Sequence, residues 1–242
     1  MLQKFDTLVL GLGAMGAAAA YHLAKSGQRV LGLDRFTPPH TFGSSHGQTR
    51  IIREAYFEHP LYVPLVQRAY KLWAELEATY GRRLFLQTGG LMIGPPEGVV
   101  FSGARRSAQE HSLAHEILTA AEVRRRFPAL RPDDRMMAVW EPRAGILFPE
   151  TCIEAHLKLA RENGAQLLFE QPALQWRPEG AGVHVVTPDA EYVADRLVLT
   201  VGAWVNSLLP DFPLRLQVER QILFWFAPRS EGPEFKPERC PI

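Results

Sequence analysis

A short glycine-rich stretch near the N-terminus, GLGAMG, constrains the fold of this chain more than any other feature. It places Gly11, Gly13 and Gly16 in the spacing G-x-G-x-x-G. In that spacing, the first glycine allows a tight turn after a strand and the second lets the backbone approach a pyrophosphate. The third lets a helix pack closely on the strand. The spacing alone is weak evidence, because glycine-rich turns also occur in unrelated α/β proteins.

The residues around this stretch strengthen the interpretation. Residues 8–10 form an apolar run typical of a short buried strand, and residues 14–27 are rich in alanine and end at a glycine. A second apolar strand over residues 29–34 ends at Asp34, 18 residues after Gly16. A carboxylate at that place can accept hydrogen bonds from a ribose diol. The sequence therefore predicts a βαβ unit that binds a dinucleotide.

The unit itself does not distinguish NAD from FAD, but the residues after it favour a flavin. Residues 35–50, RFTPPHTFGSSHGQTR, contain two prolines and no amphipathic period. The small residues Ser44 and Ser45, between two glycines, let the backbone lie against a flat ring. We expect the backbone N–H groups and His46 to face the pyrimidine edge of that ring.

Two arginines follow this loop, at Arg50 and Arg53. Their spacing would put them on one face if a helical turn begins there. Guanidinium pairs are suited to binding carboxylates. The alternative is a solvent-exposed loop that carries two surface arginines.

The middle of the chain is predicted to be mixed. Residues 62–80 have helical periodicity, with Gly81 as the terminating glycine, and Thr119 with Glu122 forms a capping box for a short helix. Two strand pairs are expected, a hairpin within residues 84–94 and a second pair within residues 135–148.

Alternation of strands and helices returns near residue 150. A helix is expected from Pro149 to Gly164. The later expectations are three strands (165–170, 182–187 and 196–202), a short helix (203–209) and a last strand (218–228). The predicted fold class is therefore α/β, a Rossmann-like FAD-binding domain interleaved with a sheet-rich substrate domain. We expect the first domain over residues 1–83 and 145–212 and the second over residues 84–144 and 213–242.

Composition excludes several functions. Net charge is +1, from 27 basic and 26 acidic residues, and no basic patch suggests nucleic acid. No apolar run has the length of a membrane span. Cys152 and Cys240 form neither a disulfide framework nor a metal site, so we expect a cytoplasmic protein without a metal.

The chain resembles the monomeric sarcosine oxidase and N-methyltryptophan oxidase family of flavoproteins. The resemblance is carried by GLGAMGAAAAYHLAKSG, PPHTFGSSHGQTRIIREAY, YVPLVQRAYKLWAELE, TGGLMIGP, EHSL, GILFPETCIEAHLKLARENGA and LVLTVGAW. It implies an FAD-dependent oxidation of a secondary amine, such as an N-methyl amino acid, to an imine, with O₂ reduced to H₂O₂. It also implies that the full-length protein is a monomer.

The resemblance also implies residue roles. Gly11, Gly13, Gly16 and Asp34 match the residues that bind the ADP part of FAD. Ser44, Ser45, His46 and Arg50 match the loop against the flavin, and His46 and Arg50 would act in catalysis. Arg53 matches the arginine that binds the substrate carboxylate, and Gly202 falls in a second flavin-contacting turn.

The chain departs from the family in length. The resemblance implies that an active-site lysine, a second cation and the cysteine that holds a covalent flavin would lie beyond Ile242. We therefore expect an N-terminal portion whose C-terminal part is missing, a non-covalent flavin and little turnover by this chain alone. A D-amino-acid or glycine oxidase and a non-catalytic flavin-binding fragment stay open as alternatives.

Overall fold

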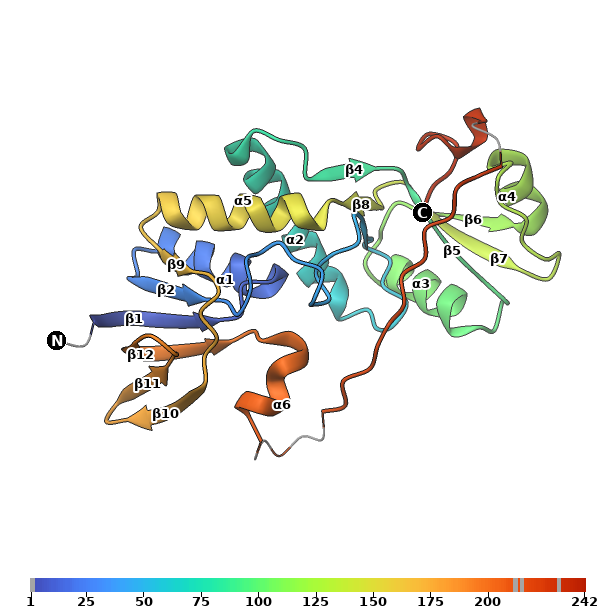
Figure 1. Ribbon diagram of the computed structural model, residues 1–242. Coiled ribbons are helices and arrows are strands. Elements are labelled where there is room, and N and C mark those ends of the chain that lie inside the picture. The colour runs from blue at the N-terminus through green and yellow to red at the C-terminus, as the bar shows by residue number, and fades with distance from the viewer. Residues whose placement is uncertain (1–2, 211–212, 214–215, 230–231) are drawn as a thin grey trace. The chain divides into compact units, whose positions relative to one another are not determined.

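The computed structural model describes residues 3–210, 213, 216–229 and 232–242. The chain divides into two compact units. Figure 1 colours the chain by residue number. One contains Met1–Gln48 and Pro149–Leu223, and the other contains Thr49–Phe148 and Phe224–Ile242. The division differs from the expected domain bounds mainly at residues 49–83, which group with the second unit.

A six-stranded sheet organises the first unit, in the order β10-β11-β12-β1-β2-β9. Its strands are β1 (Gln3–Leu10), β2 (Val30–Leu33), β9 (Gln166–Leu168), β10 (Gln175–Glu179), β11 (Gly182–Val186) and β12 (Glu191–Leu199). Strand β1 is parallel to both β12 and β2, and β2 is parallel to β9. The β10-β11-β12 part is antiparallel. Residues far apart in sequence therefore meet at the carboxyl end of β1.

Two helices pack beside the parallel strands of this sheet, α1 (Ala14–Lys25) and α5 (Pro149–Glu162), as Figure 1 shows. Helix α1 contacts β1 and β2, and α5 contacts α1 and β9. Both helices and their closing glycines agree with the sequence prediction: Gly27 and Gly164 have φ of 87° and 90°. Such left-handed backbone favours glycine, because it has no Cβ.

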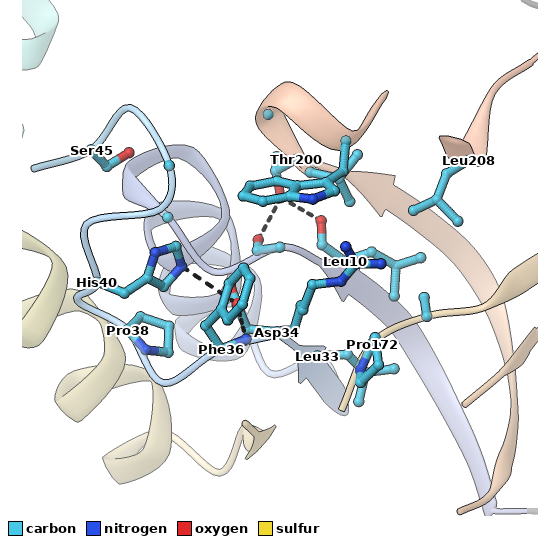
Figure 2. Close-up of a pocket in the computed structure, with 18 of the residues that line it drawn as sticks. Leu10, Leu33, Asp34, Phe36, Pro38, His40, Ser45, Pro172, Thr200 and Leu208 are labelled. Atoms are coloured by element: carbon cyan, nitrogen blue, oxygen red, sulfur yellow. Dashed lines mark hydrogen bonds and ion pairs between the residues drawn. The ribbon is translucent and has the colours of Figure 1, made fainter. Parts of the chain in front are cut away.

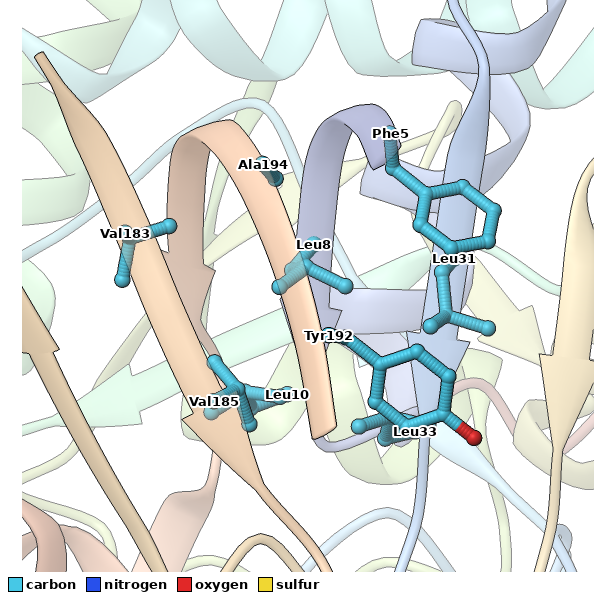
Figure 3. Packing of buried hydrophobic residues seen from close by; sticks show 9 residues of the cluster. All are labelled: Phe5, Leu8, Leu10, Leu31, Leu33, Val183, Val185, Tyr192 and Ala194. Atoms are coloured by element: carbon cyan, nitrogen blue, oxygen red, sulfur yellow. The ribbon is translucent and has the colours of Figure 1, made fainter. Parts of the chain in front are cut away.

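The other side of the same sheet carries the core drawn in Figure 3. Alternate residues of a strand point to the same face, so Leu8 and Leu10 of β1 meet Leu31 and Leu33 of β2. Val185 of β11 joins them and is fully buried. All four residues of β2 are buried, as expected for a strand covered on both faces.

The second unit contains two three-stranded sheets, ordered β3-β8-β4 and β5-β7-β6. Their strands are β3 (Arg50–Ile52), β4 (Phe85–Gln87), β5 (Gly90–Gly94), β6 (Glu116–Thr119), β7 (Met137–Glu141) and β8 (Gly145–Leu147). Its α-helices are α2 (Tyr62–Tyr80), α3 (Val99–Glu110) and α4 (Ala120–Arg126). The predicted capping box is present, with Thr119 and Glu122 bonded reciprocally.

Both predicted strand pairs of this unit are wrong in their pairing. Strands β4 and β5 form as expected but belong to different sheets, and so do β7 and β8. The chain leaves one sheet and enters the other near Gly89, where φ is 71° and a Cβ would overlap the Trp140 ring. Pairing with β7 and β8 from elsewhere in the chain replaces the local hairpin.

Two further expectations are corrected. Arg50 begins strand β3, so the proposed helical turn over Arg50 and Arg53 does not form. Residues 218–228 form no strand, and Phe224 and Phe226 are exposed. Strands β3, β6 and β10 and helix α3 were not predicted. The three strands have only three to five residues each, and the buried face of α3 consists of one phenylalanine and small residues.

Within the described residues, no helix has the length and apolar character that crossing a bilayer requires. Cys152 is buried within α5, and Cys240 is half-buried near the C-terminus.

Candidate functional site

The glycine-rich turn joins β1 to α1 in the way that its spacing predicts. Gly11 follows β1 with φ of 87°, and a Cβ there would lie 2.5 Å from the Thr200 carbonyl oxygen. A Cβ on Gly16 would overlap the Gly11 carbonyl oxygen. These glycines therefore let α1 begin directly above the carboxyl end of the sheet.

The N-terminus of α1 is suited to an anion. Gly13 is its N-cap. The first turn, which the structure describes in full, contains no acidic side chain. Ser45 Oγ accepts a hydrogen bond of 3.1 Å from the Ala14 N–H. The partial positive charge at a helix N-terminus and its free N–H groups stabilise phosphate.

Asp34 lies at the end of β2, as the sequence predicts, and is almost fully buried at 6% exposure. Its Oδ2 accepts a 2.6 Å hydrogen bond from the Leu12 N–H, and its Oδ1 accepts a 2.8 Å bond from the Phe36 N–H. His40 Nε2 lies 3.6 Å from Oδ1. Each carboxylate oxygen has two lone pairs, so acceptor capacity remains for a hydroxyl group.

A cavity of about 200 Å³ unites these features, and Figure 2 shows several of its residues. Asp34, Phe36 and His40 lie together in this view, across from Thr200 and Leu208. The predicted site residues that line the cavity are Gly11, Gly13, Asp34, Ser44, Ser45 and Gly202. Gly16 serves the helix–strand contact instead, and His46 is not among the lining residues.

Aromatic rings form one wall that sequence reasoning missed. The Phe36 ring lies 5.6 Å from that of Trp204 and 4.9 Å from that of His40, between centroids. The Arg35 guanidinium lies 5.8 Å from the Trp204 ring centroid. Flat apolar walls suit a nucleobase, which stacks on aromatic side chains. An aromatic residue two positions after the acid, as Phe36 is after Asp34, gives only a weak sequence signal for such a role.

The turn after β12 completes the cavity. Thr200 donates its backbone N–H to the Leu10 carbonyl over 2.8 Å, and its Oγ1 lies 2.7 Å from the Gly11 carbonyl oxygen. Gly202 has φ of 53° and starts a short 3-10 helix. These bonds join a turn near residue 200 to the glycine-rich turn at residue 11.

The loop over residues 43–48 is fastened to α5 as well as to α1. Glu150 Oε1 accepts hydrogen bonds from the Gly47 N–H at 2.8 Å and the Gln48 N–H at 3.1 Å. Burial raises the pKa of Glu150, but these N–H groups and the nearby charge of His46 outweigh it and hold the pKa below its usual value. The sequence predicts a helix that begins at Pro149 but gives no signal that Glu150 holds this loop.

The two predicted arginines belong to the second unit. Arg50 Nη1 donates to the Thr49 carbonyl oxygen over 2.9 Å. Arg53 Nη2 donates to the Glu58 carboxylate over 3.0 Å, and its guanidinium lies 4.6 Å from the Tyr56 ring centroid. The Arg53 side chain is 17% exposed. A half-sheltered guanidinium beside aromatic rings is a suitable carboxylate-binding group.

A buried carboxylate, Glu141, holds the backbone next to Arg53. Its two oxygens accept the N–H groups of Glu54 and Ala55, both over 2.7 Å. Burial raises the pKa of the Glu141 carboxyl, and the two hydrogen bonds oppose that shift. Burial and the negative charges of Glu141 and Glu54 also raise the pKa of Tyr70.

The residues around the cavity fit a dinucleotide cofactor. A Cβ at position 13 would lie 3.2 Å from Ser45 Oγ, a tight contact, so glycine there leaves room on this wall. The carboxylate and the helix N-terminus supply the two polar contacts that a ribose and a pyrophosphate need. No group of His, Cys, Asp or Glu suited to a metal ion occurs among the residues that the structure describes.

Comparison with known proteins identifies relatives along nearly the whole chain. Residues 6–241 match the family described as FAD dependent oxidoreductase. A monomeric sarcosine oxidase of Streptomyces avermitilis is 46% identical over 242 residues, which are 100% of this chain and 63% of that protein. An N-methyl-L-tryptophan oxidase of Yersinia pestis is 40% identical over 210 residues, 87% of this chain and 57% of that protein.

A solved structure gives the same picture of the fold. NikD, described as an unusual amino acid oxidase essential for nikkomycin biosynthesis, matches with a TM-score of 0.77 and 30% identity. The match covers 86% of this chain and 54% of NikD. The chain thus spans less than two thirds of the length of these relatives.

Proposed function

Because the chain belongs to the family of FAD-dependent oxidoreductases, we propose that it binds FAD and serves the oxidation of a secondary amine of the N-methyl amino acid type. The observation that carries this proposal is a single cavity that joins Asp34 to Ser45 at the start of α1. Sarcosine and N-methyl-L-tryptophan oxidases among the relatives support the substrate class.

The cavity residues would hold the nucleotide part of FAD. Asp34 would accept the ribose hydroxyls, because its carboxylate keeps unused lone pairs beside two backbone bonds. The α1 N-terminus and Ser45 would bind the pyrophosphate. The Ala14 N–H, which donates to Ser45 Oγ in this structure, would then donate to a phosphate oxygen instead. Phe36 and Trp204 would flank the adenine.

The reaction itself depends on groups near the flavin. When bound, FAD supplies a two-electron acceptor for the carbon next to the amine nitrogen, and O₂ serves as the final oxidant, giving H₂O₂. Arg50 would place a positive charge, and His46 a ring nitrogen, beside the edge of the flavin where negative charge develops. Ser44, Gly13 and Gly202 would offer backbone against the cofactor.

Arg53 would bind the substrate carboxylate. Its guanidinium is paired with Glu58 and supported by Tyr56 and Phe57, 4.6 Å and 4.8 Å from the ring centroids. A substrate carboxylate would therefore replace Glu58, whose side chain is 44% exposed and can turn to solvent. The exchange would hold the amine carbon in place for oxidation.

A binding experiment tests the first part of the proposal. Purified chain is titrated with FAD and, separately, with NADH, and binding is followed by flavin fluorescence and calorimetry. Asp34→Ala is compared with Asp195→Ala, which removes an exposed acid paired with Lys4. We expect Asp34→Ala to weaken FAD binding about tenfold to a hundredfold, since bonds to a charged group contribute about 1.5–3 kcal/mol. Asp195→Ala should bind FAD like the wild type.

Tight NADH binding without FAD binding would refute this assignment. Turnover is tested by H₂O₂ release with a panel of sarcosine, N-methyl-L-tryptophan, glycine and D-alanine. Preference for glycine or D-alanine would replace the N-methyl substrate class with a D-amino-acid or glycine oxidase activity. FAD binding without turnover on any amine would favour a flavin-binding role for this chain.

A further inference from the structure

The loop that carries His46 is fixed at two points on either side of that residue. On one side Ser45 Oγ accepts the Ala14 N–H at 3.1 Å, which ties the loop to the start of α1. On the other side Gly47 and Gln48 donate their N–H groups to one oxygen of Glu150, at 2.8 Å and 3.1 Å. His46, which would face a flavin, therefore lies between two anchors.

The second anchor holds an unfavourable backbone. Gly47 has φ of 115° and Gln48 has φ of 67°. A left-handed conformation is costly for a residue with a Cβ, and it persists where neighbouring groups enforce it. Two consecutive N–H groups converge here on a single carboxylate oxygen, and a charged acceptor makes such bonds stronger than neutral ones. Glu150 is thus the group that stabilises this turn.

The position of Glu150 on α5 makes the anchor rigid. It lies in the first turn of a 14-residue helix, whose N-terminal dipole also favours a negative charge. The helix packs against α1, which carries the phosphate-binding end. Both anchors of the loop consequently stand on helices that contact each other.

We propose that Glu150 is a positioning residue, which sets residues 43–48 against the flavin through the Gly47 and Gln48 amides. The proposal rests on the proposed FAD site. Without Glu150 the loop would have to be ordered by the cofactor itself, so that FAD binding weakens.

Three substitutions separate the hydrogen bonds from the charge. Glu150→Gln keeps one acceptor oxygen of the same reach but removes the charge. Glu150→Asp keeps the charge but is one methylene shorter. Glu150→Ala removes both, and Glu162→Ala, at an exposed acid in the last turn of α5, is the matched control.

The readouts are the FAD dissociation constant, the visible absorbance and circular dichroism of bound flavin, and hydrogen exchange at Gly47 and Gln48. We expect Glu150→Ala and Glu150→Asp to raise the dissociation constant about tenfold or more and to speed exchange at both amides by a similar factor. Glu150→Gln keeps an acceptor but loses the charge that strengthens both bonds, so its values should lie between those of Glu150→Ala and the wild type. Glu162→Ala should match the wild type.

Each result decides something. If the wild type binds FAD and all Glu150 variants bind it equally, with unchanged spectra, the positioning role is wrong. If Glu150→Gln fails like Glu150→Ala while Glu150→Asp succeeds, charge is responsible and the hydrogen-bond account is overturned. Amide exchange needs no flavin, so a wild type that protects Gly47 but binds no FAD would refute the proposed function and leave the loop anchor standing.

Discussion

The guanidinium of Arg53 donates to both oxygens of Glu58, at 3.1 Å and 3.0 Å, and so carries a carboxylate of its own protein. Its Nε is buried and has no hydrogen-bond partner within the described residues. The side chain thus already binds the chemical group that an amino-acid substrate would present. Glu58 is the more exposed member of the pair and is the one that can leave.

Arg53→Ala should therefore weaken the binding of amines that carry a carboxylate. Truncating one member of a sheltered charge pair costs about 2–5 kcal/mol, so the KM for sarcosine should rise by about two orders of magnitude. An N-methyl amine without a carboxylate should change much less. Where turnover is too slow, the dissociation constant of sarcosine measured by calorimetry serves instead. Equal losses for both amines would make Arg53 structural.

Glu58→Gln should have the opposite effect. It removes the internal competitor of the substrate while keeping the size of the side chain, so sarcosine should bind more tightly, by a few-fold for a partly exposed ion pair. The comparison uses the same calorimetric titration. Weaker binding of sarcosine by Glu58→Gln would contradict competition between the two carboxylates.

Any flavin on this chain should be non-covalent. Cys152 is 4% exposed within α5, and Cys240 lies in the segment that precedes the C-terminus. After acid precipitation of the FAD complex, the yellow colour should remain in the supernatant. Colour in the pellet that disappears in Cys152→Ser or Cys240→Ser would show covalent attachment.

Gly16→Ala should destabilise the fold strongly, because the added Cβ overlaps the backbone oxygen of Gly11. Forcing atoms into a packed contact costs about 1–3 kcal/mol or more. Gly43→Ala is the matched control, since a Cβ there meets only His40 at 3.5 Å. Urea unfolding at neutral pH measures both, and equal midpoints would refute the packing role of Gly16.

Stability should fall in mild acid because of His156. Burial and, to a smaller extent, the charge of His22 lower its pKa from 6.5 to about 4, against the opposing effect of a hydrogen bond to the Cys152 backbone. The unfolded chain binds the proton first, so the free energy of unfolding falls as pH drops from about 6.5 to about 4. The loss from this one group is about 3 kcal/mol over the whole interval, of which about 2 kcal/mol falls between pH 7.5 and pH 5. Urea midpoints at pH 7.5 and pH 5 measure it.

His156→Leu supplies the control for that measurement. The substitution keeps an apolar side chain between α1 and α5 and removes the titrating group, so its unfolding free energy should vary less between pH 7.5 and pH 5. A pH dependence identical to that of the wild type would show that His156 does not cause the acid instability.

The parts of the fold that the sequence predicted correctly are local. The β1–α1–β2 unit, with Gly11, Gly16 and Asp34 in place, follows from apolar runs, helix propensity and glycine spacing within about 30 residues. Helices α2 and α5 follow from periodicity and terminal glycines. In these segments the local conformational preferences of neighbouring residues agree with one another and with the fold. The elements can therefore be predicted without knowing which distant residues they contact.

Strand pairing, in contrast, was decided by tertiary structure. The sequence suggested that β4 pairs with β5, yet each pairs with a strand more than 40 residues away. Residues 218–228 have an apolar strand-like pattern but form no strand. A strand exists only where another chain segment supplies its hydrogen bonds, and that partner is not encoded locally.

The candidate site divides in the same way. Glycine spacing, Asp34 and the Ser44–Ser45 loop could be read from the sequence, because a phosphate-binding turn needs particular residues at fixed offsets. Glu150 and Trp204 could not, since each reaches the site from more than 100 residues away, and an acid in a first turn or an aromatic in a short helix has many other uses.

Local chemistry therefore determined where a nucleotide could bind. Packing of β12 beside β1 and of α5 beside α1 decided which distant side chains complete the site. Hydrogen bonds and close contacts depend on distance in space, which sequence separation does not specify.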